Sequence, residues 1–191
     1  MSAEVLYFDL ASPYAYLAVS RVASVLGRMP QLEPVLLGAI FKWRGSGSWS
    51  ATSIRELRIA EIEARAKHYG LPPIVWPAAW PANALPAMRA ATWAKAQGRT
   101  EEFAQAVYRA EFTRGADVSD VAVLARCAGQ VGLDGSRLAA AIQCPAIKEQ
   151  LRQATTAAWQ GGVRGVPTLI VAETVFYGDD QLELAAAGRA P

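Results

Sequence analysis

Ser12 and Pro13 stand where an apolar run, residues 5–10, gives way to a segment whose apolar residues have helical spacing. Serine is a favoured N-cap residue and proline a favoured first residue of a helix, so the pair predicts a helix that begins at Pro13. The first N–H groups of a helix lack partners within it and carry partial positive charge. The sequence therefore predicts a hydroxyl beside free donors that could hold an anion such as a thiolate, with a plain N-cap as the alternative.

A second motif, Gly165-Val166-Pro167-Thr168, comes directly before a predicted strand. A proline in this setting, behind a glycine, is typical of a tight turn that can contain a cis peptide bond. A cis bond would leave the backbone N–H and C=O of Val166 free at the sheet edge, where the backbone of a peptide-like ligand could pair with them. A proline that only begins a strand is the alternative interpretation.

Other residue types that carry chemistry are scarce, because the chain has two cysteines and one histidine. Cys127 and Cys144 are too far apart for a Cys-x-x-Cys pair, and we expect them to be buried thiols. His68 is alone and the acidic residues show no metal spacing, so no metal cofactor is expected. A Ser-His-Asp triad is poorly supported as well, because His68 falls in a helix unrelated to Ser12.

Composition indicates an ordinary globular protein of one domain, or of one domain with a large insertion. The chain has 191 residues, 52% of them hydrophobic and 19% charged, and a formal net charge of +2. It has no run of Lys and Arg interleaved with aromatic residues, so no nucleic-acid partner is expected. No apolar run approaches the roughly 18 residues of a membrane span, and residues 1–4 lead directly into a strand without signal-peptide features. We therefore expect no membrane partner and a cytoplasmic location.

The chain alternates between strand and helix signals at its two ends and is helical between them. Residues 13–26 are expected to form one helix and residues 32–37 a second strand, which closes a right-handed β-α-β unit with parallel strands. After Gly161-Gly162 the pattern predicts a hairpin of strands 168–171 and 175–177, followed by a last helix that opens at 178–184. The helices expected in the middle are 54–69, 85–97, 100–113, 119–131, 136–143 and 145–160.

This order, β-α-β, then helices, then β-β-α, predicts an α/β thioredoxin-like fold interrupted by a large all-helical insertion. We assign residues 1–45 and 161–191 to the thioredoxin-like domain and residues 46–160 to the helical insertion.

Four motifs follow one another along the chain: Phe8-Asp9-x-x-Ser12-Pro13-Tyr14-x-Tyr16-Leu17, Leu37-Gly38-Ala39-Ile40-Phe41-Lys42, Gly165-Val166-Pro167-Thr168 and Phe176-Tyr177-Gly178-x-Asp180-x-Leu182-Glu183. In this order they resemble the 2-hydroxychromene-2-carboxylate isomerases. Those enzymes belong with the kappa-class glutathione transferases in the DsbA-like branch of thioredoxin folds. The resemblance extends over almost the whole chain.

The resemblance implies a glutathione-dependent isomerase in which Ser12 replaces the first cysteine of a disulfide oxidoreductase. Ser12 would donate a hydrogen bond to the glutathione sulfur, and the helix N-terminus would lower the thiol pKa from its usual value of about 8.5. Activated glutathione would then add reversibly to an aromatic conjugated carboxylate and be released unchanged. Val166 and Pro167 would pair with the backbone of the tripeptide.

The resemblance also assigns the end of the tripeptide that carries the α-amino group. Asp180 matches the family carboxylate that holds this group, although Asp180 with Glu183 also fits a capping box. Asp179 stands where many relatives carry Ser or Asn, and its added charge is expected to weaken binding of the anionic tripeptide.

Substrate-binding residues are expected at the end of the first half of the thioredoxin-like domain and in the first part of the insertion. Lys42 resembles a family lysine that attracts a carboxylate, with a solvated lysine after a strand as the alternative. Asn83 resembles an asparagine of the substrate pocket, and an N-cap is its alternative. Nearby tryptophans could form an aromatic wall suited to a flat substrate, or fill the core or a homodimer interface: Trp43, Trp49, Trp76 and Trp80.

Two further interpretations stay open, and a third is disfavoured. A kappa-like glutathione transferase or peroxidase would use the same thiolate but consume glutathione. A non-catalytic thiol- or peptide-binding protein would keep the cis-proline edge without chemistry. A dithiol oxidoreductase is disfavoured, because Ser12 and Ala15 occupy the positions of its two cysteines.

The arginines of the predicted helix 54–69, which are Arg55, Arg58 and Arg65, are expected to be solvated.

Overall fold

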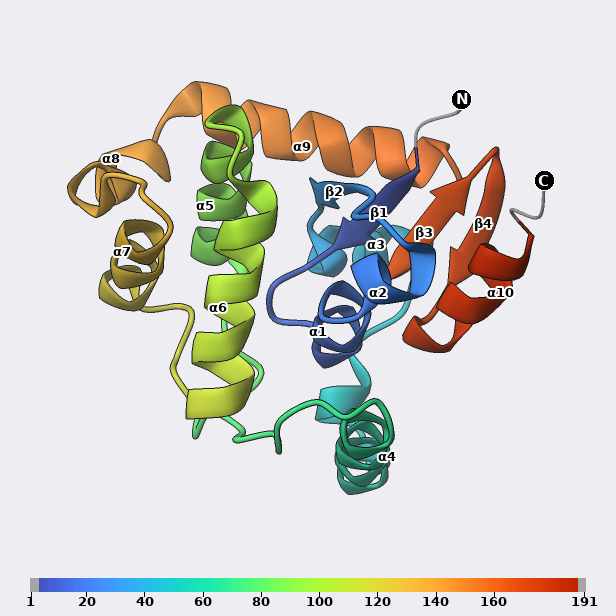
Figure 1. Cartoon of the computed structure of the whole chain (residues 1–191). Coiled ribbons are helices and arrows are strands. Elements are labelled where there is room, and N and C mark those ends of the chain that lie inside the picture. The colour runs from blue at the N-terminus through green and yellow to red at the C-terminus, as the bar shows by residue number, and fades with distance from the viewer. Residues whose placement is uncertain (1–3, 189–191) are drawn as a thin grey trace.

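The computed structural model describes residues 4–188, and within them a mixed four-stranded sheet has the order β2-β1-β3-β4 (Figure 1). The central strand β1 (Val5–Phe8) pairs in parallel with β2 (Gln31–Pro34) and antiparallel with β3 (Thr168–Val171). β3 forms an antiparallel hairpin with β4 (Thr174–Tyr177). The predicted thioredoxin-like fold is confirmed.

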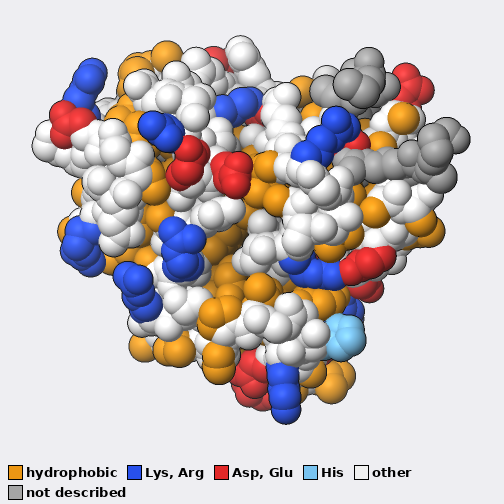
Figure 2. All heavy atoms as spheres, viewed as in Figure 1, with side chains coloured by type: hydrophobic (Ala, Val, Ile, Leu, Met, Phe, Trp, Pro, Cys, Tyr) orange, Lys and Arg blue, Asp and Glu red, His pale blue; other side chains and the backbone are white. Residues whose placement is uncertain are grey.

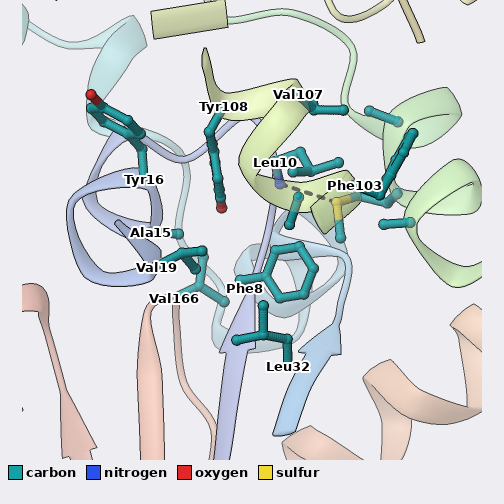
Figure 3. Packing of buried hydrophobic residues seen from close by; sticks show 14 of the residues in the cluster. Phe8, Leu10, Ala15, Tyr16, Val19, Leu32, Phe103, Val107, Tyr108 and Val166 are labelled. Carbon is teal, nitrogen blue, oxygen red and sulfur yellow. Dashed lines mark hydrogen bonds between the residues drawn. The ribbon is translucent and has the colours of Figure 1, made fainter. Parts of the chain in front are cut away.

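The core lies between the sheet and the helices that cover it. Leu6 and Phe8 alternate with half-buried residues along β1 and are fully buried. Figure 3 shows Phe8 and Leu10 facing Phe103 and Tyr108, which belong to a helix of the insertion. Burial of each such large side chain stabilises the fold by roughly 1.5–3 kcal/mol, so the sheet and the insertion depend on each other for their core.

The segment after Ser12 forms two helices, α1 (Pro13–Val19) and α2 (Val22–Leu26), so the prediction of one helix over residues 13–26 is wrong at Ser20 and Arg21. Arg21 leaves the helical conformation because its side chain has partners elsewhere. Its guanidinium lies 3.7 Å from the centroid of the Tyr69 ring and donates to the backbone oxygen of Asp179 at 3.0 Å. These tertiary contacts have no signature in the local sequence.

The second strand ends at Pro34, and helix α3 (Leu37–Arg44) occupies the end of the predicted strand 32–37. No side chain at the start of α3 caps the helix. Asp9 supplies the missing acceptor instead, because Leu37 N–H donates to Asp9 Oδ2 at 2.9 Å. An apolar run can belong to a strand or to a buried helix, and here a distant carboxylate decides for the helix.

The insertion packs onto the sheet, with α9 (Pro145–Gln160) crossing the top of the view and α4 (Arg55–His68) at the bottom (Figure 1). α5 (Leu85–Ala96) and α9 both contact β2, and α9 also contacts α3. Leu10, two residues beyond the end of β1, donates its N–H to the sulfur of Met88 in α5 at 3.1 Å. The division at residues 46 and 160 stays a prediction. The elements are η1 (Trp49–Ala51), α4 (Arg55–His68), α5 (Leu85–Ala96), α6 (Thr100–Arg114), α7 (Val121–Gln130), η2 (Gly135–Arg137), α8 (Leu138–Ala141) and α9 (Pro145–Gln160).

The C-terminal segment forms a short 3-10 turn, η3 (Asp179–Gln181), and then α10 (Leu182–Ala187), which contacts α2 and β3. The capping box considered for Asp180 and Glu183 does not form. Gln181 is the N-cap residue of α10 and makes no side-chain cap, while Glu183 pairs with Arg21. The charge of Glu183 therefore serves the contact between α10 and the break after α1.

On the face seen in Figure 2, Lys and Arg side chains alternate with Asp and Glu over a surface that also has apolar areas. Within residues 4–188, no helix combines the length and the low polarity that crossing a bilayer requires. The same residues contain no group of three or more His, Cys, Asp or Glu side chains placed to hold a metal ion.

The turn between β3 and β4 gives a test of backbone strain. Ala172 and Glu173 both have positive φ, 47° and 70°, where a side chain is disfavoured. Two-residue hairpin turns of this kind prefer Asn-Gly. The double variant Ala172→Asn, Glu173→Gly is expected to raise the free energy of unfolding by about 1 kcal/mol, measured by urea unfolding. Ala172→Val, whose branched side chain suits this conformation even less, is expected to lower it.

Candidate functional site

Ser12 is the N-cap of α1, and its hydroxyl proton is free. Its Oγ accepts a hydrogen bond from Ala15 N–H at 3.2 Å, and its own N–H donates to the backbone oxygen of Asp9 at 3.0 Å. The residue is 4% exposed. A serine hydroxyl has one proton to donate, and no acceptor for it occurs among residues 4–188. The site therefore offers a buried O–H donor at the start of a helix.

Two cavities meet at Ser12. The first has a volume of about 390 Å³ and includes charged side chains from α4 and η3; we call it the charged cavity. The second has a volume of about 290 Å³ and is lined mainly by aromatic, proline and alanine residues; we call it the apolar cavity. The residues that line both are Ser12, Leu37, Phe41 and Trp49.

The predicted edge at Pro167 borders the charged cavity. The Val166-Pro167 peptide bond is cis, and both residues line this cavity. The N–H and C=O of Val166 make no backbone hydrogen bond with the described residues, whereas Pro167 accepts one from Gly178 N–H at 3.0 Å. Gly165 leaves room for the ring of Tyr177, because a Cβ there would lie 2.7 Å from that ring and would force it to move. The free Val166 groups can pair with an extended ligand backbone.

Asp179 is buried at the end of the charged cavity and is compensated by partners from α4. Its Oδ1 lies 3.0 Å from Arg65 Nη1, and its Oδ2 accepts from the Tyr69 hydroxyl at 3.0 Å. Burial raises the pKa of Asp179, while Arg65 and Tyr69 oppose that rise. Burial together with Asp179 raises the pKa of Tyr69 to about 12. The carboxylate of Asp179 is thus paired inside the protein. The side chain of its neighbour Asp180 is half-exposed, and Asp180 Oδ2 lies 3.5 Å from Arg65.

Helix α4 contributes three residues to the charged cavity, and two of them are arginines that were expected to be solvated. Arg58, Glu61 and Arg65 all line it. Their spacing of three and four residues places them on one face of the helix, which is a signal that the sequence contains. The expectation of simple solvation is wrong for Arg65, which bonds to buried Asp179. What the sequence could not give is the position of α4 against the start of α1.

Two of the predicted substrate residues, Trp80 and Asn83, line the apolar cavity. Trp80 is 6% exposed, and its ring centroid lies 5.3 Å from that of Trp49, another wall residue. Asn83 Oδ1 also accepts from Leu85 N–H at 3.1 Å, so it helps to begin α5 as well. Lys42 and Trp43 line neither cavity.

Lys42 and Trp43 lie on the exposed part of α3. The ring of Trp43 packs 5.8 Å from that of Trp159, and Trp43 is 42% exposed. Their role toward a substrate stays a prediction.

Asp9, a residue of the first motif, also lines the apolar cavity, which the sequence did not predict. It is the one ionisable residue among those described around the apolar cavity, and it is 2% exposed. Its Oδ1 accepts from Ala11 N–H at 3.0 Å and its Oδ2 from Leu37 N–H at 2.9 Å. Burial raises the pKa of Asp9 to about 6 despite these two bonds.

Two residues of α6 face Asp9 from behind. The Tyr108 hydroxyl donates to the backbone oxygen of Asp9 at 3.0 Å. Glu111 is fully buried, and neither of its carboxylate oxygens has a hydrogen-bond partner. Burial, with Asp9 and Asp117 nearby, raises the pKa of Glu111 well above its usual value. Burial therefore disfavours the charged forms of two acids close to the loop that carries Ser12.

A thioredoxin-like sheet with a serine at the first helix and a cis-proline opposite defines a class of protein, and comparison with known proteins agrees. The model of the DSBA-like thioredoxin domain family matches residues 5–187, so the chain belongs to this family. The chain is 31% identical over 184 residues to a 2-hydroxychromene-2-carboxylate isomerase from Sphingobium xenophagum, covering 93% of this chain and 92% of that protein. The resemblance expected from the motifs is confirmed.

Solved structures show the same fold. A 2-hydroxychromene-2-carboxylate isomerase superposes with a TM-score of 0.84 at 24% identity, over 98% of this chain and 95% of the other. A probable DsbA oxidoreductase from Streptomyces coelicolor superposes with a TM-score of 0.72 at 20% identity, over 99% and 91% of the two chains. The named relative of 31% identity supports an enzyme of the isomerase type.

Asp9 gives a prediction about pH. Its pKa of about 6 lies above the ordinary value of 3.8, so the folded state binds more protons between these values. The contribution of Asp9 to stability therefore falls as the pH rises from about 4 to about 6, by about 3 kcal/mol in total. Asp9→Asn removes this dependence. The free energy of unfolding of the variant, relative to that of wild type, is therefore expected to increase from pH 4 to pH 7. Urea unfolding across this range measures the difference.

A control is the exposed Asp134, whose bonds to Ser136 lower its pKa. Asp134→Asn is expected to show no such gain over wild type. A difference between Asp9→Asn and wild type that stays constant with pH would contradict the assignment.

Proposed function

We propose that this protein is a glutathione-dependent isomerase of the 2-hydroxychromene-2-carboxylate isomerase type, in which Ser12 activates the glutathione thiolate. The observation that carries the proposal is the position of the buried Ser12 hydroxyl at the junction of a charged and an apolar cavity. One reactant is a charged peptide and the other an aromatic compound, so each cavity suits one of them.

The residues around the charged cavity fit glutathione. Val166 offers an unpaired backbone N–H and C=O, which suit the cysteinyl backbone of an extended peptide. Ser12 offers an uncommitted O–H. Asp180 has a half-exposed carboxylate beside the same cavity, suited to an α-amino group. Asp179 supports this end indirectly, since Arg65 compensates its charge.

When bound, glutathione would supply a thiolate that adds reversibly to a conjugated carbon of the substrate and leaves unchanged. Ser12 lowers the thiol pKa by donating its O–H to the charged form, and the uncommitted N–H of Tyr14 at the start of α1 acts in the same direction. The low exposure of Ser12 strengthens these interactions, because little water competes for the sulfur.

The apolar cavity orients the second reactant. Trp49 and Trp80 present ring surfaces whose centroids are 5.3 Å apart, and Phe41 and Pro81 extend the apolar lining. A flat aromatic compound gains contact with these rings and displaces water from the reacting carbon. Asn83 can orient a polar group of the substrate with the amide donor that its bond to Leu85 leaves free.

The test is the thiol pKa of bound glutathione, followed by ultraviolet absorbance of the thiolate against pH. In wild type we expect a value at least about one unit below 8.5. Ser12→Ala is expected to return the pKa toward 8.5 and to lower kcat for a chromene carboxylate by about 100-fold or more. Ser24→Ala, which removes an exposed hydroxyl from α2, is the matched control and should leave both unchanged.

An unperturbed thiol pKa in wild type, or equal pKa values in wild type and Ser12→Ala, would remove the basis of the proposal. The fate of glutathione separates the related activities. A constant glutathione concentration during many turnovers is expected for an isomerase, whereas loss of one glutathione per product indicates a transferase or a peroxidase.

A further inference from the structure

The hydroxyl of Tyr14 is buried in the wall of the charged cavity and has no hydrogen-bond partner among the described residues. Two neighbours hold the Tyr14 ring in place. The Trp49 ring makes an edge contact with it at a centroid distance of 6.1 Å, and the Arg65 guanidinium lies 5.7 Å from the centroid of the Tyr14 ring. A buried polar group without a partner costs about 1–3 kcal/mol. Such a group in a cavity wall points to a ligand that completes its hydrogen bond.

The charges that surround this hydroxyl indicate which kind of ligand group it meets. Burial and Glu61 raise the pKa of Tyr14, while Arg58 and Arg65 oppose the rise, and Arg58 lies close enough to the hydroxyl to interact with it directly. Glu61 accepts from Arg58 at 2.6 Å and from Arg65 at 2.6 Å. A phenol O–H next to two guanidinium groups favours an anion.

Arg58 has donors to spare for that anion. Arg65 already holds both Glu61 and Asp179, whereas Glu61 is the only ion-pair partner of Arg58 within residues 4–188. A guanidinium has five N–H donors and binds carboxylates in a two-pronged geometry. Tyr14 and Arg58 together therefore make a half-complete carboxylate site.

The carboxylate site at Arg58 and the end of the cavity that contains Asp180 lie at different positions along α4. Arg58 precedes Arg65 by seven residues, which corresponds to about 10 Å along the helix axis. Arg65 lies beside Asp180, the residue proposed to hold the amino end of the ligand. A three-residue extended peptide is about 10 Å long, so its far end falls near Arg58.

We propose that the Tyr14 hydroxyl and Arg58 bind the glycyl carboxylate of glutathione, an inference that rests on the proposed function of the charged cavity. The spacing of charged residues along helix α4 then matches the length of the peptide. Arg65 and Asp180 bind its γ-glutamyl end, and Arg58 and Tyr14 bind its glycyl end. The site would select a thiol with a carboxylate at this distance over a shorter thiol.

Calorimetric titration of two probes tests the proposal: glutathione and its ethyl ester at the glycyl carboxylate. Tyr14→Phe removes only the hydroxyl, and since that atom has no partner in the protein we expect an unchanged or higher melting temperature. We expect the variant to bind glutathione about tenfold more weakly than wild type does. The ester should bind wild type and the variant within twofold of each other, because the anion that the hydroxyl serves has been removed.

Arg58→Ala provides a second variant, expected to lose tenfold or more in affinity for glutathione and little for the ester. Arg55→Ala is the matched control: Arg55 is on the same helix, pairs with Glu56 and lies outside the charged cavity. Its affinity for glutathione should stay within twofold of wild type.

The outcomes separate the two levels of the argument. Equal losses for glutathione and for the ester in Tyr14→Phe, or no loss for either, would overturn the carboxylate assignment while leaving glutathione binding intact. Failure of wild type to bind glutathione at all would overturn the proposed function and this inference together.

Discussion

One buried carboxylate joins the elements that form the site. Asp9 accepts N–H groups from the loop that carries Ser12 and from the first residue of α3, and Tyr108 of α6 bonds to its backbone oxygen. Sheet, first helical layer and insertion thus meet at one residue. Because α3 supplies Leu37 and Phe41 to both cavities, the shapes of the cavities depend on this connection. The protein accepts the unfavourable burial of a charge at Asp9 where geometry around Ser12 matters most.

The two cavities differ in how they treat charge, and Ser12 lies on the boundary. In the charged cavity every buried carboxylate has a cationic partner, as Asp179 has Arg65. The apolar cavity has aromatic walls and one acid whose pKa is raised. An anion beside Ser12 therefore has donors on one side and a low-dielectric wall on the other. Interactions at such a boundary are stronger than in water, since solvent cannot rearrange to weaken them.

The sequence predicted those parts of the fold and site that depend on neighbouring residues. Ser12 with Pro13 predicted the helix start, and Val166 with Pro167 predicted the turn, because caps and turns are local. The helix of α3 and the break at Arg21 were missed, since a distant carboxylate and a distant ring decide them. Arg58 and Arg65 were missed as lining residues for the same reason: their shared face is visible in the sequence, but the position of α4 is not. The apparent capping box failed because Glu183 has a stronger partner in Arg21.

The sheet topology has a consequence for synthesis of the chain. The central strand β1 is made first, yet one of its two neighbours, β3, comes near the other end of the chain and pairs Ile170 with Val5. Until then β1 has one open edge, which is a template for wrong pairing with other chains. Some of the helices between them pack on their neighbours in the chain, as α6 does on α5 and α7, and such local contacts form quickly. The insertion can therefore cover the unfinished sheet during synthesis, before the last two strands are added to the chain.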